Sequence, residues 1–410
     1  MKKVIFAGAY GIRSQGDDAA LISMVEGLRR RLDNFDGVVI ARHAHEEHYA
    51  PYELRCIPNI EYEHKSESIG KWFRGFNYDD DRSHLRLLQQ EISTSDLLVL
   101  GASNFLVDVS IDLLKGPIPY LVILTLMAKM VGTPVMWFGI SVGPFRTDYG
   151  RALSRLAASM ANAVTVRDQR SVEELAQLGY SGEVVQLPDP VLGLRAPRPD
   201  VARAITYWRQ AHDKKRGPII VVSVRDIPPT GNLSAQQYID QMARVCDGLA
   251  SRHAATLLFI PQCTYEHGNP SEDDRNVARW VVEQMQFPHN AIVVNDHLTV
   301  EGCLALYSQA DVGLCTRLHG NVYAAIQGVP SVAVSYLPKV AEFMRWLGCA
   351  DLVVALPEVS SATMLERLEM AIARREEISN RILARVQSGR TAIEQYIDIA
   401  CAQIAIGRQT

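Results

Sequence analysis

The sequence contains no pair of cysteines spaced as C-x-x-C, and its seven cysteines are scattered over 410 residues. Disulfide frameworks and cysteine-paired zinc sites normally show an even count or a fixed spacing. An odd number of isolated thiols is instead typical of small buried side chains in a reducing compartment. We therefore expect a cytoplasmic protein whose cysteines are buried.

Several catalytic motifs are also missing. There is no G-x-S-x-G, no H-E-x-x-H and no Cys/His pair with a family signature, so a serine hydrolase or a zinc enzyme is not supported. Long lysine or arginine blocks are absent as well, and the formal net charge is -4. This balance gives no sign of a nucleic-acid surface, and we predict no nucleic-acid partner.

No apolar run is long enough to cross a bilayer. The most apolar window, residues 118–127, is cut short by Lys129 and Gly132, below the ~20 residues that a span needs. We predict a buried helix there, with a peripheral membrane contact as the second interpretation. The amino-terminal MKKVIFAGAYG resembles a signal peptide only briefly, because Arg13 and Asp17 follow too soon. A first β-strand fits it better.

Hydrophobic residues make up 48% of the chain and charged residues 21%, an ordinary globular composition. Short, almost continuous apolar runs alternate with helical segments, as is typical of parallel strands buried on both faces. The strands expected in the first half lie at residues 2–9, 36–42, 96–102, 134–143, 163–168 and 184–189. Those expected in the second half lie at 218–226, 255–262, 291–296, 311–316 and 330–336.

A proline-rich and charged seam between residues 188 and 218 separates these halves. We predict an α/β protein with two Rossmann-like, doubly wound domains that face a cleft, at residues 1–190 and 215–360. A helical segment follows at 361–410. Because ligands in such sheets bind at the carboxyl ends of strands, motifs at those ends are the candidates for function.

The first candidate is AGAYGIRSQGDDAAL, after the first strand. Gly11 and Gly16 have the spacing of a P-loop, but Asp17 and Asp18 stand where a P-loop has Lys and Ser or Thr. Glycines let the backbone approach a ligand, so we assign Asp17 to function and Tyr10 to substrate binding. Capping of the helix that follows is the structural alternative, which we favour for Asp18.

The second candidate is RLHGN, after the strand at residues 311–316. Arg317 and His319, two apart on an extended segment, are expected on the same side of the chain. A helix expected to start near Asn321 would add its free N–H groups. A cation, an imidazole and a helix start together favour an anion such as phosphate.

Two further groups of cations follow strands. In SYLPK, Lys339 opens a helix next to Tyr336, where a cation opposes the helix dipole and so favours an anionic partner. In VRDQRS and SVRDIP, Arg167 and Arg225 follow strands and could bind an anion bidentately, or tie neighbouring loops together. Ser171 is expected to cap the helix after VRDQRS.

One cluster of histidines could in principle bind a metal ion. RHAHEEH brings His43, His45 and His48 together with two glutamates. Because the segment is expected to be a loop without further ordering contacts, a metal is the weaker interpretation, and we predict no metal. We likewise predict no bound cofactor.

Taken together, the motifs resemble those of polysaccharide pyruvyl transferases. GAYGIRSQGDD, DLLVLGA, GISVGP, TVRDQRS, a PDP turn, RLHGN and SYLPK occur in that family's order, from about residue 4 to residue 348. Where the family usually has a run of glycines, this chain has GASNFLVD, residues 101–108. Because that loop would lie near the acceptor, the departure leaves the acceptor open.

The resemblance implies a GT-B-like fold and transfer of pyruvate from phosphoenolpyruvate onto two sugar hydroxyls as a ketal. Arg317, His319 and Lys339 match the family's donor pocket, and Arg167 matches its R-D-x-x-S arginine. The expected partners are phosphoenolpyruvate and a glycan or lipid-linked sugar. A homo-oligomer and a contact with the inner membrane face stay open.

On this basis we assign His319 and Asp17 to catalysis. Substrate binding is assigned to Arg317, Lys339, Arg167, Arg225, Tyr10, Asn321 and Tyr336. A nucleotide-sugar glycosyltransferase of the same fold is one alternative, since the same cations would hold a diphosphate. A catalytically silent glycan-binding protein is the other.

Overall fold

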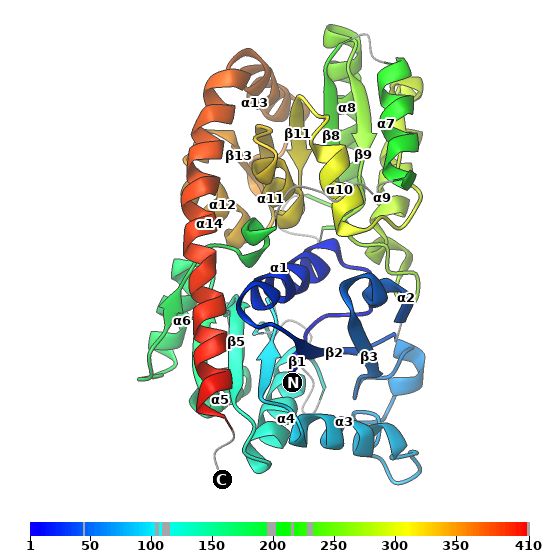
Figure 1. The fold of residues 1–410 in the computed structure, drawn as a ribbon. Helices are drawn as coiled ribbons and strands as arrows, with labels where there is room; N and C mark the ends of the chain where they lie inside the picture. Colours follow the sequence, from blue (N-terminus) through cyan, green and yellow to red (C-terminus); the bar gives the residue numbers. More distant parts are fainter. Residues whose placement is uncertain are drawn as a thin grey trace. The chain divides into compact units, whose positions relative to one another are not determined.

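The computed structural model describes residues 1–43, 46–102, 106–108, 115–194, 202–214, 217–227 and 233–407. The chain divides into two compact units (Figure 1). The first comprises Met1–Leu194 together with Gly389–Thr410, and the second comprises Arg195–Ser388. Each unit is built on one sheet of parallel strands.

The first sheet has seven strands in the order β3-β2-β1-β4-β5-β6-β7. Its strands are β1 (Lys2–Ala7), β2 (Phe35–Ala41), β3 (Leu54–Pro58), β4 (Leu97–Leu100), β5 (Val135–Ile140), β6 (Ala163–Val166) and β7 (Val185–Gln186). All six strands predicted in this half are present. The prediction missed β3, which forms one edge of the sheet.

The second sheet has six strands in the order β10-β9-β8-β11-β12-β13. They are β8 (Ile219–Ser223), β9 (Thr256–Phe259), β10 (Ala291–Val293), β11 (Val312–Cys315), β12 (Ser331–Ser335) and β13 (Val353–Ala355). The five predicted strands are confirmed, and β13, again an edge strand, was missed. Both orders are those of doubly wound Rossmann-like sheets, as the sequence predicted.

The helices of the first unit follow its strands in alternation. They are α1 (Gln15–Arg31), α2 (Glu46–Tyr49), α3 (Ser83–Ser93), α4 (Pro117–Met130), α5 (Asp148–Met160) and α6 (Gln169–Gln177). The acids in the first turn of α1 and the arginines in its last turn complement the helix dipole.

The second unit alternates in the same way. Its helices are α7 (Ala202–Lys214), α8 (Ala235–His253), α9 (Asp274–Glu283), α10 (Val300–Tyr307), α11 (Leu318–Ile326), α12 (Pro338–Trp346) and α13 (Ser361–Ala373). The last helix, α14 (Arg375–Ile406), begins in the second unit and ends in the first.

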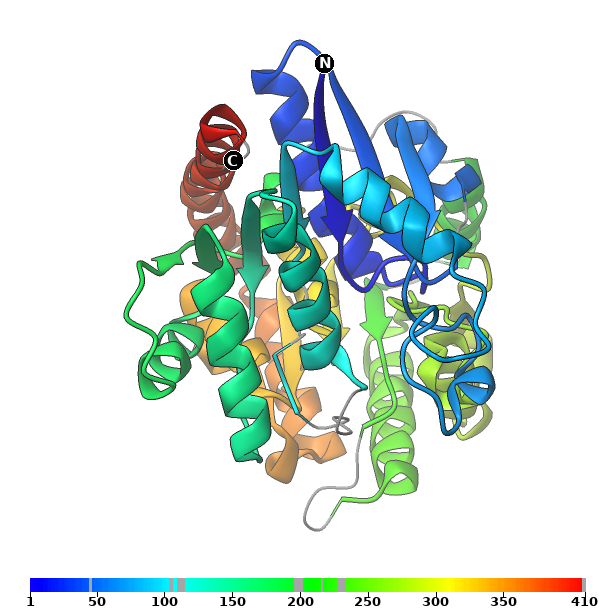
Figure 2. The same ribbon diagram turned by 90° about the horizontal axis from the view of Figure 1, so that it is seen from below.

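Helices cover both faces of the first sheet. On one face α3, α4 and α5 pack against strand side chains such as Ile5 and Leu98, and in Figure 2 these helices lie in front of the strands. Elsewhere in this unit α1 packs against the end of α14, where Ile397 meets the backbone of Gly27 so closely that a methyl group there would clash. Helices thus pack against the strands, and loops follow the carboxyl ends of the strands.

Helices of the second unit pack in two groups. One group consists of α8, α9 and α13, and the other is the series α7, α10, α11 and α12. Two such groups on one parallel sheet are what a doubly wound fold requires.

The cysteines and the most apolar segment of the chain were both predicted to be buried. All seven cysteines are free thiols, and six of them are buried. The apolar window at residues 118–127 lies in α4, which is buried on the side facing the sheet but exposes Leu126 and Met130. Across the described residues, we find no helix with the length and apolar character needed to span a membrane.

Candidate functional site

The strand order of each sheet reverses at one point, and such points are where doubly wound folds bind ligands. In the second unit this point lies between β8 and β11. Arg225 follows β8, Arg317 follows β11, and Tyr336 follows the neighbouring strand β12. The structure therefore brings three of the predicted residues to one edge of one sheet.

Arg317 is held by a buried carboxylate. Its Nε lies 3.2 and 3.1 Å from the two oxygens of Asp274, and its Nη2 lies 2.6 Å from Oδ1. The Asp274 side chain is 1% exposed and also accepts the N–H groups of Gln262 and Cys263 at 3.0 and 2.9 Å. Burial opposes the charge of Arg317, but Asp274 outweighs it and raises the guanidinium pKa above its ordinary value.

Sequence reasoning did not identify Asp274. It is the first residue of α9, directly after the N-cap residue Asp273, whose side chain accepts the N–H of Arg275. Paired acids at a helix start are an ordinary capping signal. Nothing in that signal says that the second acid turns inward to orient an arginine from another strand.

Tyr336 lies among cations. The Nη1 of Arg225 donates to its hydroxyl at 2.6 Å, and the guanidinium carbon lies 4.5 Å from the ring centroid. Burial opposes ionisation of the phenol, but the charges of Lys339, Arg225 and Arg317 outweigh it and lower the Tyr336 pKa to about 8. These four residues, which we call the cation cluster, thus act on one another electrostatically.

Lys339 is the second residue of α12, after Pro338, as the sequence predicted. In this first helical turn it faces the unfavourable end of the helix dipole. An anion bound at the cation cluster would offset that cost.

The helix after Arg317 starts earlier than predicted. α11 begins at Leu318 rather than near Asn321, and Arg317 is its N-cap residue with extended backbone. His319 therefore lies within the first helical turn, and the argument from side-chain alternation along an extended segment was wrong. Its position still places the imidazole at the amino end of α11, where free N–H groups favour an anion.

Asn321 is fully buried behind this turn. Its amide nitrogen donates to the carbonyl oxygen of Arg317 at 3.0 Å, and its amide oxygen accepts from the hydroxyl of Ser331 at 2.9 Å. These bonds tie α11 to β12. The structure thus places Asn321 as a support of the β11–α11 turn.

In the first unit, the loop after β1 also reaches a switch point, between β1 and β4. Tyr10 is 2% exposed, and burial, followed by the charges of Asp17 and Asp18, raises its pKa well above the ordinary value. A methyl group at Gly101, which follows β4, would lie 2.1 Å from its hydroxyl oxygen. Tyr10 therefore packs across the switch point and fills the space that Gly101 leaves.

The two acids of this loop have different partners. The sequence predicted that Asp18 caps α1, and this was wrong, because the N-cap residue is Ser14 and Asp18 lies in the first turn. It accepts from the hydroxyl of Tyr49 at 3.0 Å and lies 3.1 Å from Nε2 of His48. Asp17 is partly exposed and accepts from the Ser14 hydroxyl at 2.5 Å.

Arg167 lies in a buried ion pair of the first unit. Its Nη1 is 3.2 Å from Oδ2 of Asp189, both side chains are 4% exposed, and its Nε donates to Ser141 at 2.8 Å. Arg167 belongs to the first unit, whereas the cation cluster belongs to the second. The cap of α6 is Asp168 rather than Ser171, because Asp168 accepts the Ser171 N–H at 2.8 Å.

Two predicted features lie partly outside the described residues. In the GASNFLVD loop, residues 103–105 are not described, while Asp108 accepts the N–H groups of Arg146 and Thr147. Of the histidine cluster, His45 is not described, His43 is buried and His48 contacts Asp18. Among the described residues, no group of three or more His, Cys, Asp or Glu side chains could hold a metal ion.

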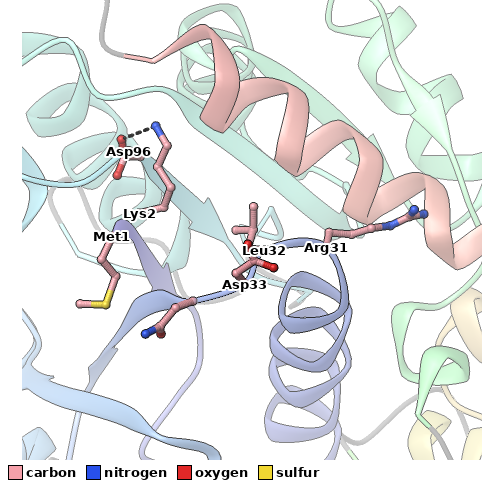
Figure 3. Close-up of a pocket in the computed structure, with 7 residues that line it drawn as sticks. Met1, Lys2, Arg31, Leu32, Asp33 and Asp96 are labelled. Carbon is pink, nitrogen blue, oxygen red and sulfur yellow. Dashed lines mark hydrogen bonds and ion pairs between the residues drawn. The ribbon is translucent and has the colours of Figure 1, made fainter.

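A surface hollow occurs elsewhere in the first unit, at the amino end of β1 and the carboxyl end of α1 (Figure 3). Its lining residues are Met1, Lys2, Arg31, Leu32, Asp33, Asn34 and Asp96. Lys2 donates to Asp96 across it at 3.2 Å. Because ligands of these folds bind at the opposite ends of the strands, it is not the candidate site.

Solved structures share the fold at low sequence identity. UDP-GlcNAc 2-epimerase from Methanocaldococcus jannaschii aligns with a TM-score of 0.61 at 10% identity, over 98% of this chain and 100% of that one. The Neisseria meningitidis epimerase bound to UDP-GlcNAc and Anabaena HepE in complex with UDP and glucose each give 0.58, at 13% and 12% identity. Each of these two alignments covers 99% of this chain and 100% of the other. The likeness confirms the GT-B-like fold.

Sequence comparison is more specific. The chain is 22% identical to the amylovoran biosynthesis protein AmsJ of Erwinia amylovora, over 95% of this chain and 96% of AmsJ. The profile of the polysaccharide pyruvyl transferase family matches residues 16–338, which include the loop acids of α1 and the arginines after β8 and β11. With a match over most of its length, the chain belongs to the polysaccharide pyruvyl transferase family.

Proposed function

We propose that this protein transfers the pyruvyl group of phosphoenolpyruvate onto two hydroxyls of a sugar, forming a ketal during polysaccharide biosynthesis. The observation that carries the proposal is the cation cluster at the carboxyl ends of β8, β11 and β12. Phosphoenolpyruvate carries a phosphate and a carboxylate on one small carbon skeleton. The two arginines and the lysine of the cation cluster could bind both of these anionic groups.

The reaction needs a proton, a base and charge stabilisation. Protonation of the C3 methylene turns C2 into an oxocarbenium-like centre, which one sugar hydroxyl attacks with loss of its proton. The C2–O bond to phosphate then breaks, with its electron pair leaving on phosphate, and the second hydroxyl adds to C2. One hydroxyl proton balances the new methyl group and the other leaves with phosphate.

In this proposal Arg317 and Lys339 hold the phosphate. Asp274 fixes the plane of the Arg317 guanidinium through Nε and Nη2, and Nη1, for which no bond is found among the described residues, would meet the ligand. The free N–H groups at the start of α11 add to the same attraction. His319, in that first turn, is a phosphate partner or the acid.

Of the two arginines proposed for the carboxylate, Arg225 is favoured. Its Nε donates to the carbonyl oxygen of Asp226 and its Nη1 to Tyr336, and no hydrogen bond of its Nη2 is found within the described part of the chain. Arg167 is already engaged with Asp189 and Ser141. We therefore propose Arg225 as the carboxylate ligand and Arg167 as a support of its own unit.

The acceptor side is assigned to the first unit. Asp17 is the partly exposed acid of the β1–α1 loop, and we propose it as the base that takes a proton from an acceptor hydroxyl. Tyr10 and Gly101 lie at the same switch point and would shape the space beside it. The buried thiols fit a reducing compartment, so we place the reaction in the cytoplasm.

The decisive experiment measures phosphate release from phosphoenolpyruvate against a panel of free and lipid-linked glycosyl acceptors. We expect release that depends on an acceptor and a product whose mass increases by one pyruvyl ketal. In parallel, phosphoenolpyruvate should raise the melting temperature, and UDP should not. A shift with UDP alone would favour a nucleotide-sugar glycosyltransferase, and glycan binding without phosphate release would favour a silent binding protein.

A variant pair ties the activity to the site. Arg317→Gln should lower kcat/KM for phosphoenolpyruvate by about 10²–10³-fold, because a charged donor to the phosphate is lost. Arg279→Gln, an exposed position on α9, is the matched control and should leave kcat/KM unchanged. Equal activity of the two variants would contradict the assignment of Arg317.

A further inference from the structure

The neighbours of Tyr336 determine whether its hydroxyl group donates or accepts a hydrogen bond. Arg225 approaches it with Nη1 at 2.6 Å, and a guanidinium has donors but no acceptor. The phenolic oxygen must therefore accept this bond. Within the described part of the chain, Arg225 is the only hydrogen-bond partner found for Tyr336, so the phenolic proton has no protein acceptor there.

The position of Tyr336 limits what can receive that proton. Tyr336 follows β12, and Lys339 stands three residues later in the first turn of α12. The other charged side chains that act on it are Arg225 and Arg317, and Arg317 is paired with Asp274. All three charged side chains that act on the phenol are cations, which donate and do not accept. A bound anionic substrate is the acceptor that this arrangement lacks.

We propose that Tyr336 is the general acid of the donor site, and that Arg225 positions its hydroxyl so that the proton is delivered to C3 of phosphoenolpyruvate. This inference rests on the proposed function. In the step, the π electrons of the C2–C3 bond take the phenolic proton, and the O–H pair stays on Tyr336 as phenolate. C2 becomes the oxocarbenium-like centre that the acceptor hydroxyl attacks. The proton that this hydroxyl releases later restores Tyr336 through solvent.

The surrounding charges suit this role. Arg225 and Lys339 stabilise the phenolate that forms as the proton leaves, which is stabilisation of charge that develops in the transition state. The same charges bring the Tyr336 pKa to about 8, close to neutral pH, where a general acid is both protonated and able to transfer its proton. His319 is then left to the phosphate.

The test compares Tyr336→Phe with Tyr78→Phe, whose side chain is 95% exposed. Wild-type turnover is measured first, because its absence would refute the proposed function and not the role of Tyr336. With wild-type activity in hand, Tyr336→Phe should lower kcat about 10²–10⁴-fold while phosphoenolpyruvate still raises the melting temperature. Tyr78→Phe should match wild type. A Tyr336→Phe enzyme with unchanged kcat, or one that only raises KM, would overturn the inference.

The pH dependence gives a second readout. Because the acid must be protonated, kcat/KM of the wild type should fall as the pH rises through about 8. Absorbance at the phenolate band should show one tyrosine titrating in that range, and the transition should be missing in Tyr336→Phe. Phosphoenolpyruvate should move it to higher pH, because the bound anion offsets the cations. An unchanged alkaline limb in Tyr336→Phe would contradict the assignment.

A second variant keeps the proposal testable if Tyr336→Phe does not fold. Arg225→Gln retains a hydrogen-bond donor but removes one cation beside the phenol. The alkaline limb of kcat/KM should then move to higher pH, because the phenolate loses part of its stabilisation. A limb that stays in place would show that Tyr336 is not the titrating acid.

Discussion

At the scale of single residues, Asp274 is a buried acid whose contacts are with Arg317 and with backbone N–H groups. Its carboxylate is buried, accepts two backbone N–H groups and orients Arg317 through three contacts. A carboxylate removed from water keeps its charge only with such partners. In the proposed site, Arg317 and the acid that orients it would therefore act as one functional group.

Replacing Asp274 with Asn should lower the free energy of unfolding by about 2–3 kcal/mol, because Arg317 loses its counter-charge in a mostly buried setting. Urea denaturation measures this change. Glu283→Gln, at an exposed position on the same helix, is the control and should change the free energy by less than about 0.5 kcal/mol. If both variants were equally stable, the buried pair would contribute nothing to folding.

The partners of the two Arg-Asp motifs could not be predicted from the sequence. Arg167 and Arg225 both follow a strand and precede an aspartate, so this local pattern does not show which of them is buried in an ion pair. The structure pairs Arg167 with Asp189, 22 positions away, and Arg225 with Tyr336, 111 positions away. Which arginine is buried and which stays available depends on these long-range partners.

At the scale of elements, every central strand was predicted, whereas two of the four edge strands, β3 and β13, were missed. Central strands such as β5 and β8 are continuous apolar runs because both faces are buried. β3 has the sequence LRCIP, with an exposed Arg55 and a terminal proline, and β13 has only three residues. In β3, the charged residue and the proline interrupt the apolar pattern that identified the other strands.

The start of α11 was misplaced for a related reason. Arg317, Leu318 and His319 contain no cap residue of the usual kind, and the Arg317 side chain makes no capping bond. The turn is fixed instead by the Asn321 amide and by close packing of Gly320. A methyl group at Gly320 would lie 3.0 Å from the side chain of Ser223 and from the hydroxyl of Tyr307.

This packing predicts the effect of Gly320→Ala. The added methyl group should push the first turn of α11 away from β8, lowering the free energy of unfolding by about 1–3 kcal/mol and weakening phosphoenolpyruvate binding. Chemical denaturation and the ligand-induced melting shift measure the two effects. Gly302→Ala in α10, where the nearest atom would lie 3.3 Å away, should cost less and leave binding unchanged. Equal effects of the two substitutions would contradict a special role for Gly320.

At the scale of the whole molecule, the sequence did not predict to which unit the carboxyl-terminal helix belongs. The helical character predicted for residues 361–410 is confirmed by α13 and α14 as far as Ile406. Helical periodicity does not say which sheet a helix packs against. The residues from Gly389 onward belong to the first unit, where Tyr396 packs its ring against Phe138 at 4.9 Å between centroids.

The first unit should therefore depend on the last helix for its stability. Tyr396 is fully buried, and its hydroxyl donates to the carbonyl oxygen of Pro188 at 3.1 Å. Tyr396→Ala should lower the free energy of unfolding by about 3–5 kcal/mol, through a cavity and an unpaired carbonyl. Ile406→Ala, on the same helix but 63% exposed, should change it by less than about 0.5 kcal/mol. Hydrogen exchange in Tyr396→Ala should accelerate first at β5 and β6, and acceleration confined to the second sheet would contradict this account.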